Sequence, residues 1–250
     1  MPIEQDIERA RQARCVTLTQ EHRGHGVSTT AYYLGRVLVA QGLRVLLADL
    51  TGRHARLSAL TARRPIKNLV IWTPSIARPQ DIGPAIEHAR RETTGRADVI
   101  LLDVDAPLLE RAGGFTLGLD YVVAVTESTA AGQHIVERLA ARLHDEPPPN
   151  GRVGVVFSRV DAPSAAALPD QTEARHLPVI GYYPADYLLA GGDAYSLKGS
   201  APVTPHDTYL SAVMRIGRKL AQIIPLNRLP SFSGVERYLP PCETNGQHPS

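Results

Sequence analysis

Cysteine is nearly absent from this chain, which has two cysteines among its 250 residues, Cys15 in an apolar run and Cys242 in a polar C-terminal stretch. Two isolated cysteines exclude both a disulfide framework and a cysteine-based zinc site. Aromatic residues are also scarce, at 5%. No apolar run approaches the roughly 18 residues of a membrane span, and the charged start lacks the basic-then-apolar order of a signal peptide. We therefore expect a cytoplasmic protein.

Neither sign of charge dominates, because 27 Lys and Arg residues stand against 25 Asp and Glu residues and leave a net charge of +2. This balance argues against a dedicated nucleic-acid module, since such modules carry a clear basic excess. One basic stretch contains Arg53, Arg56, Arg63, Arg64 and Lys67. We interpret it as a solvated surface and expect no nucleic-acid partner.

Short β-rich runs alternate with helical patterns through most of the chain. Several of these runs are continuously apolar, as in strands that helices cover on both faces. The expected strands are residues 15–19, 43–48, 69–72, 99–102, 121–125, 153–157 and 179–182. Helical spacing appears between and after them, as at Leu210, Val213, Met214 and Leu220. The alternation predicts an α/β fold with a doubly wound, mostly parallel sheet and helices on both faces.

One domain accounts for this alternation, and we place it at residues 14–225. Residues 1–13 form an N-terminal extension whose apolar spacing is that of a short polar helix. Residues 226–250 continue a stretch in which proline recurs at positions 225, 230, 240, 241 and 249. Proline removes backbone hydrogen bonds from a helix, so we expect a flexible, proline-rich tail.

A glycine-rich segment follows the first expected strand and leads into a helix that starts near Val27. Gly24 and Gly26 would let backbone N–H groups approach a phosphate, and the positive end of the helix would face it. A hydroxyl of Ser28 or Thr29 could then reach Mg²⁺. A strand, a glycine loop and a helix in this order are the right context for an anion site.

The P-loop pattern G-x-x-x-x-G-K-[ST] is incomplete here, with Glu21 at the first glycine position and Val27 at the lysine position. A charge-assisted hydrogen bond contributes about 1.5–3 kcal/mol, so the missing lysine would weaken triphosphate binding about tenfold to a hundredfold. His22 or Arg23 could compensate in part if the loop turns them inward. The candidate nucleotide-binding residues are Arg23, Gly24, His25, Gly26, Val27, Ser28 and Thr29.

Six stretches of the sequence follow one another in a characteristic order. They are residues 24–34 (GHGVSTTAYYL), 41–50 (QGLRVLLADL), 98–107 (DVILLDVDAP), 120–126 (DYVVAVT), 155–161 (VVFSRVD) and 177–186 (LPVIGYYPAD). Together they resemble the MinD/ParA class of P-loop ATPases, to which the bacterial tyrosine kinases of exopolysaccharide export are related. The last stretch favours the MinD/ParA side, because the kinases usually end before it.

The resemblance implies a P-loop NTPase-like domain that binds ATP or ADP with Mg²⁺, although the departures at the phosphate loop leave open that no cofactor binds. Carried over position by position, the residues that would hold Mg²⁺ are Ser28, Asp49 and Asp103. Asp49 ends the second expected strand, and Asp103 ends the strand that resembles the Walker B strand of the family. No catalytic residue is assigned.

The departures from the family pattern lie at the chemistry. Val27 replaces the phosphate lysine, Thr51 stands where the family often has a second aspartate, and Ser158 replaces an asparagine usually associated with adenine. The sequence therefore predicts a degenerate homologue, a pseudo-ATPase that acts as a regulatory or scaffolding protein with weak or no hydrolysis. The alternative is an active ATPase that uses Arg23 or a partner-supplied cation in spatial positioning, secretion or pilus assembly, or polysaccharide export.

The partner that the resemblance implies is another protein, and a homodimer is left open. MinD relatives often end in a basic amphipathic helix that docks on membranes. Here proline and glycine interrupt residues 226–234 (LNRLPSFSG), so we expect no direct membrane insertion. A third hypothesis is a pure interaction module, in which side chains fill the place where a nucleotide would bind.

Overall fold

The computed structural model describes residues 13–20, 26–51, 57, 66–112, 119–127, 129, 132, 134, 137–138, 141, 153–160, 179–184 and 204–223. Residues 21–25 of the glycine loop, the N-terminal extension up to residue 12 and the C-terminal tail lie outside the described residues. The predictions made for those segments, including the domain boundaries, stay predictions.

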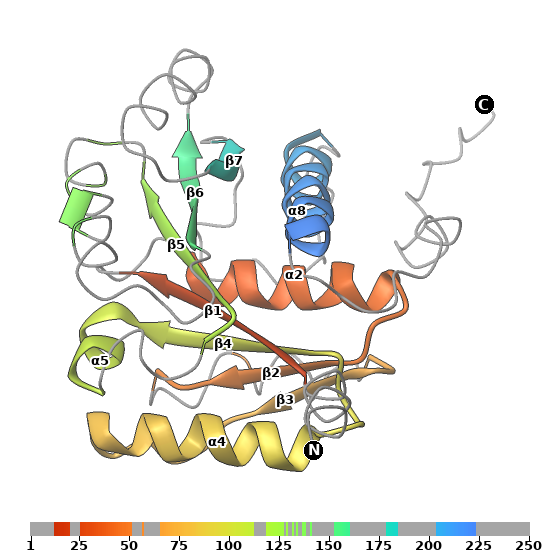
Figure 1. Ribbon diagram of the computed structural model, residues 1–250. Helices are drawn as coiled ribbons and strands as arrows, with labels where there is room; N and C mark the ends of the chain where they lie inside the picture. The colour runs from red at the N-terminus through yellow and green to blue at the C-terminus, as the bar shows by residue number, and fades with distance from the viewer. Residues whose placement is uncertain are drawn as a thin grey trace, which may run out of the picture.

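Seven strands form one sheet in which every neighbouring pair is parallel (Figure 1). The strands are β1 (Arg14–Gln20), β2 (Val45–Asp49), β3 (Leu69–Trp72), β4 (Val99–Asp105), β5 (Tyr121–Glu127), β6 (Val153–Val160) and β7 (Val179–Pro184). Their order across the sheet is β3-β2-β4-β1-β5-β6-β7. All seven expected strands are present, so the predicted fold class is confirmed.

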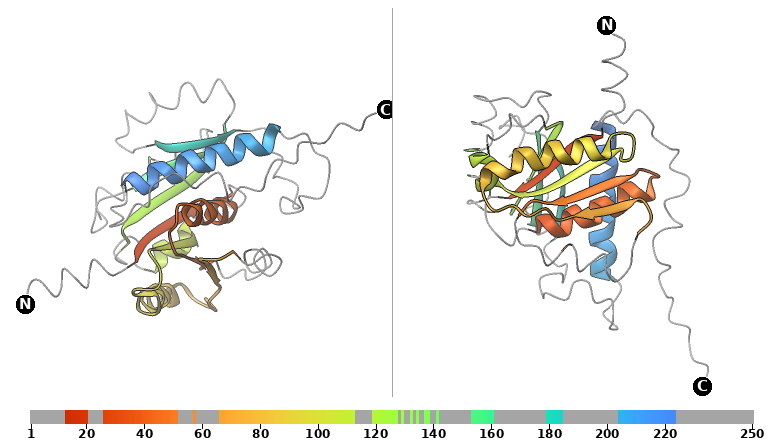
Figure 2. Two further views of the ribbon diagram at one scale, coloured as in Figure 1. Left: turned by 90° about the vertical axis from the view of Figure 1, so that its right-hand side faces the viewer. Right: turned by 90° about the horizontal axis from the view of Figure 1, so that it is seen from below.

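Helices cover both faces of this sheet (Figure 2). On one face, α2 (Val27–Ala40) packs against β1, β2, β3 and β4, and α8 (Thr204–Ile223) packs against α2 and β7. On the other face lie α4 (Ile82–Thr93), the 3₁₀ turn η1 (Pro79–Asp81) that precedes it, and α5 (Ala106–Arg111). None of the described helices combines the length and apolarity needed to cross a bilayer.

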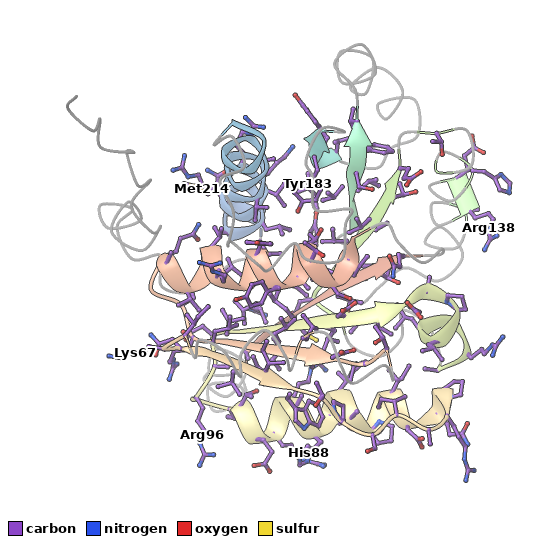
Figure 3. All side chains as sticks on the ribbon, turned by 180° about the vertical axis from the view of Figure 1, so that it is seen from behind. Lys67, His88, Arg96, Arg138, Tyr183 and Met214 are labelled. Carbon is purple, nitrogen blue, oxygen red and sulfur yellow. The ribbon has the colours of Figure 1, made fainter. Side chains whose placement is uncertain are left out.

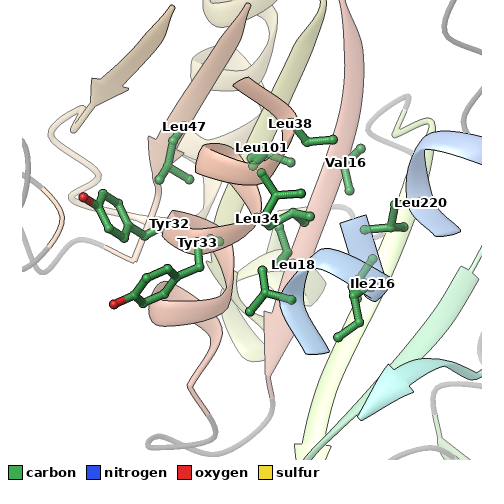
Figure 4. Close-up of a cluster of buried hydrophobic side chains, with 14 of the residues drawn as sticks. Val16, Leu18, Tyr32, Tyr33, Leu34, Leu38, Leu47, Leu101, Ile216 and Leu220 are labelled. Carbon is green, nitrogen blue, oxygen red and sulfur yellow. The ribbon is translucent and has the colours of Figure 1, made fainter. Parts of the chain in front are cut away.

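The two faces carry separate cores because successive side chains of a strand point to opposite sides of the sheet. On β1, Val16 and Leu18 face α2, whereas Cys15 faces α4. The first core, called here the α2-side core, is drawn in Figure 4. Its members include Val16, Leu18, Val27, Leu34, Leu38, Leu47, Leu101, Val123, Ile216 and Leu220.

Close packing of α8 on α2 depends on a glycine. A Cβ atom added to Gly217 would lie 2.7 Å from Cγ1 of Val37, so a larger residue would push the two helices apart. Figure 4 shows Leu34 and Leu38 of α2 close to Ile216 and Leu220 of α8. This contact ties the C-terminal helix to the helix that follows the glycine loop.

At the edge strand β3, the indole of Trp72 packs against His88 of α4, with ring centroids 5.6 Å apart. His88 is labelled on α4 in Figure 3. This contact joins the last residue of β3 to the helix layer on the face opposite α2.

Two carboxylates hold the amino-terminal edge of the sheet. Asp98 accepts hydrogen bonds from the backbone N–H of Arg44 at 2.8 Å and from Nη2 of the same residue at 2.8 Å, which joins the starts of β2 and β4. Asp120 accepts a bond from the N–H of Cys15 at 2.8 Å and pairs with Nη1 of Arg14 at 3.3 Å. These contacts set the strand register at the edge opposite the candidate site.

Cys15 is fully buried in the core that faces α4. Burial raises the pKa of its thiol to about 12, and the positive charge of Arg90 opposes that change only in part. The folded chain therefore favours the neutral thiol. The stabilisation that results is complete below the pKa of an unfolded thiol, about 8.5, and is lost as the pH rises from there toward 12.

We expect Cys15 to resist thiol reagents in the folded protein. In a Cys242→Ser background, a maleimide at pH 8 should label Cys15 only after denaturant has unfolded the chain, as followed by mass spectrometry. Labelling of the folded protein at the rate of the unfolded one would contradict the burial of this side chain.

Candidate functional site

The first turn of α2 follows the glycine loop and has no side-chain cap among the described residues. β1 ends at Gln20 and α2 begins at Val27, with Gly26 as its N-cap residue. Gly26 has φ 87°, in the left-handed region that glycine adopts without strain. Its carbonyl accepts the first helical hydrogen bond, from the N–H of Thr30 at 2.8 Å. No described side chain caps this end and no acidic residue lies in the first turn, so backbone N–H groups and the helix dipole face the carboxyl edge of the sheet.

Val27, at the position of the P-loop lysine, is turned into the interior. Only 1% of its surface is exposed, and it belongs to the α2-side core. Ser28 and Thr29, the next two residues, are half-buried. The first turn therefore brings two hydroxyl side chains and no positive charge to this edge of the sheet.

Two carboxylates lie near the carboxyl ends of neighbouring strands, on the face that α2 covers. Asp49 is the last residue of β2, whereas β4 continues two residues beyond Asp103 to Asp105, so the prediction that Asp103 ends its strand is wrong. On β2, the side chains of Val45, Leu47 and Asp49 point to the same face of the sheet, and Val45 and Leu47 belong to the α2-side core. On β4, Leu101 of that core precedes Asp103 by two residues, so both aspartates face α2. They are register partners in the β2–β4 pair.

Both aspartates are buried, with exposed fractions of 4% for Asp49 and 1% for Asp103. The N–H of Leu50 donates to the carbonyl oxygen of Asp103 at 2.9 Å, which holds the ends of β2 and β4 together beyond the last ladder pair. The backbones of the two aspartates are therefore held beside each other by the sheet.

The Asp49 carboxylate is held by the turn that follows β2. Thr51 donates two hydrogen bonds to the same oxygen, Oδ1 of Asp49, from its backbone N–H at 3.1 Å and from its hydroxyl at 2.6 Å. Such a side-chain turn is common for aspartate. The sequence shows Thr51 only as the replacement of a second aspartate, and its spacing gives no sign of this contact.

Further polar side chains lie on this face at the strand ends. Gln20, the last residue of β1, is the register partner of Asp105, and its Nε2 donates to Oδ1 of Asp105 at 3.4 Å. Glu127 ends β5 and pairs in register with Ser158 of β6. Gln20 and Asp105 are not among the residues predicted from the sequence. A signal for them is present there, because the polar residues at the carboxyl ends of parallel strands meet at one edge of the sheet.

Ser158 is buried at the position where the resemblance suggests adenine recognition. Its exposed fraction is 1%, and its hydroxyl donates to the carbonyl oxygen of Thr126 at 3.2 Å. That hydroxyl is thus committed to the neighbouring strand. Of the other candidate residues, Arg23, Gly24 and His25 lie outside the described part of the chain.

The donor chemistry of Ser28, Asp49 and Asp103 fits Mg²⁺, which prefers oxygen ligands and is commonly held by one or two carboxylates together with phosphates and water. Among the described residues, no three His, Cys, Asp or Glu side chains form a metal-binding group. The oxygen donors present are compatible with an ion that arrives together with a phosphate ligand.

Three solved structures are similar to this chain over nearly their whole length. MinD from Pyrococcus horikoshii, complexed with Mg-ADP, has a TM-score of 0.64 and 15% identity, over 86% of this chain and 99% of that one. A chain of the MinC:MinD cell division complex from Aquifex aeolicus has a TM-score of 0.61 and 18% identity, over 87% and 99%. A plasmid partition protein from Borrelia burgdorferi bound to AMPPNP has a TM-score of 0.60 and 14% identity, over 85% and 100%.

The chain has the MinD fold. The resemblance found in the sequence is thereby confirmed at the level of the fold, a P-loop NTPase-like α/β domain with an all-parallel sheet. No protein-family model matches the sequence, and no curated protein matches it. The activity within the MinD fold is argued below from the residues of this chain.

Replacing Gly26 with alanine should destabilise the protein by about 1–2 kcal/mol, because an L-residue is strained at this φ. Urea unfolding measures the loss. The same change at Gly95, which has φ 70° and open space where a Cβ would lie, serves as the matched control for backbone strain.

Gly26→Ala should also weaken the binding of inorganic pyrophosphate, whereas Gly95→Ala should not. Equal effects of the two changes on pyrophosphate binding would contradict an anion site at the start of α2.

Proposed function

We propose that this protein is a degenerate MinD/ParA-like ATPase homologue that binds Mg-nucleotide weakly, hydrolyses it slowly or not at all, and acts as a regulatory or scaffolding protein. The observation that carries the proposal is the burial of Val27 in the α2-side core. The start of α2, with Gly26, Val27, Ser28 and Thr29, retains the backbone N–H groups that would bind phosphates and is called here the cradle. The positive charge that would neutralise the phosphates is missing from it.

The energetic consequence follows from the strength of charged hydrogen bonds. Backbone N–H groups and the dipole at the start of α2 favour a phosphate by about 0.3–1 kcal/mol for each nearby charge in an exposed setting. A lysine–phosphate bond would add about 1.5–3 kcal/mol. Without it the cradle holds a nucleotide about tenfold to a hundredfold more weakly than a complete P-loop.

In a nucleotide complex, the N–H groups of the first turn of α2 would bind the phosphates, and the Ser28 hydroxyl would face the metal. Asp49 and Asp103 would hold Mg²⁺, directly or through its water molecules. Bound Mg²⁺ supplies charge neutralisation for the phosphate oxygens. The likeness to MinD with Mg-ADP and to a partition protein with AMPPNP supports nucleotide as the ligand class.

Weak hydrolysis follows from the same features. Phosphoryl transfer depends almost entirely on positioning and on stabilisation of the developing negative charge. Val27 supplies no charge, and Thr51, which stands where the family often has a second aspartate, carries a neutral hydroxyl that is too weakly basic to take a proton from water. A protein that keeps the scaffold without this chemistry is suited to binding a partner, and the MinC:MinD complex supports a protein as that partner.

Val27→Lys tests whether the rest of the cradle is preserved. We expect the lysine variant to bind Mg-ATP about tenfold to a hundredfold more tightly than the natural protein, as measured by isothermal titration calorimetry. Val27→Met is the matched control, because it introduces an unbranched side chain into the same core position without charge. The proposal would be contradicted if both variants gained the same affinity for Mg-ATP. It would also be contradicted if the lysine variant gained no affinity while its unfolding midpoint stayed unchanged.

Steady-state hydrolysis separates this proposal from an active ATPase that uses Arg23. We expect a turnover below about one per minute, with no further loss in Arg23→Ala, because catalysis without a positioned cation is slow. If the natural protein turned over faster than this and Arg23→Ala abolished the turnover, the result would favour the active ATPase instead. The measurement uses phosphate release with Mg-ATP in excess.

A further inference from the structure

We infer that Thr51 is a positioning residue, which holds the Asp49 carboxylate in the orientation that receives Mg²⁺ when a nucleotide is bound. The inference rests on the proposed nucleotide function and adds to it the residue that sets the Mg²⁺ dependence of binding.

The geometry of the turn after β2 fixes the orientation of this carboxylate. Both donors of Thr51 are directed at one oxygen, Oδ1 of Asp49, and the hydroxyl distance of 2.6 Å is in the range of charge-assisted O–H···O⁻ bonds. Two bonds to one oxygen restrict rotation of the carboxyl group about its terminal torsion, which is otherwise soft. The second oxygen, Oδ2, takes no part in the turn and can face a ligand.

The turn itself is anchored to the site. Residue 49 is the register partner of Asp103, and the N–H of Leu50 is bonded to the Asp103 carbonyl oxygen. Thr51 therefore holds a carboxylate whose backbone is already fixed relative to the second carboxylate. Hydrogen bonds of this kind, made to a metal-holding group by a residue that does not touch the metal, commonly change metal affinity about tenfold or more.

A purely structural role for the turn makes different predictions. If Thr51 only stabilised the end of β2, its loss would change nucleotide affinity equally with and without Mg²⁺. If it positions Asp49 for the metal, its loss would reduce only the gain in affinity that Mg²⁺ brings. The two roles are thus separated by measuring ADP binding in EDTA and in Mg²⁺.

The experiment compares the natural protein with Thr51→Val and Thr51→Ser by isothermal titration calorimetry with ADP. Valine keeps the shape and the backbone N–H but removes the hydroxyl, whereas serine keeps the hydroxyl. We expect Thr51→Val to lose about tenfold of the Mg²⁺-dependent gain with its affinity in EDTA unchanged, and Thr51→Ser to retain the gain. If Thr51→Val does not fold, Thr51→Ala gives the same comparison without the branched side chain.

Several results would overturn the inference. A valine variant that keeps or increases the Mg²⁺-dependent gain would do so, as would one that loses affinity equally in EDTA. ADP binding by the natural protein without any gain from Mg²⁺ would overturn the inference and leave nucleotide binding intact. No ADP binding by any variant under either condition would overturn the proposed function and this inference with it.

Discussion

The packing of Val27 into the α2-side core is the contact on which the functional account depends. This residue opens the helix that follows the glycine loop, at the point where a phosphate would be received. Because its side chain is apolar and buried, the first turn of α2 offers backbone N–H groups and two hydroxyls but no cation. In the proposed function, this helix start would keep the directional part of phosphate recognition and lack the charge that makes such recognition strong.

The parallel sheet supplies the remainder of the site through its alternation. Every second residue of a strand points to the same face of the sheet. On β2 and β4, a valine and a leucine face α2, and the residue two positions after the leucine is Asp49 or Asp103. The register of β2 and β4 makes these two aspartates partners, and at the amino-terminal ends of the same two strands Asp98 binds Arg44. The position of the carboxylates is thus a property of the whole sheet.

The sequence was sufficient for the fold and for the strands that carry the site. Short β-rich runs, several of them continuously apolar, predicted the strands that the structure describes, and the glycine loop predicted the start of α2 near Val27, because both signals are local. The sequence also shows that Val27, at the lysine position, is apolar. That its side chain is buried in the core is known only from the structure.

The side-chain partners could not be predicted in the same way. The bond from Thr51 to Asp49 depends on a turn conformation, and the bond from Gln20 to Asp105 depends on a register between strands far apart in the sequence. The commitment of the Ser158 hydroxyl to Thr126 likewise follows from strand pairing. Such contacts are tertiary, and composition and spacing carry little information about them.

The equilibrium affinity of the unmodified protein for Mg-ATP, measured by calorimetry at low and at physiological salt, tests the central claim most directly. The account predicts a dissociation constant well above about 1 μM, since a cradle without its lysine lacks about 1.5–3 kcal/mol of the interaction. A dissociation constant at or below about 1 μM would mean that another basic group replaces the lysine and would contradict the account.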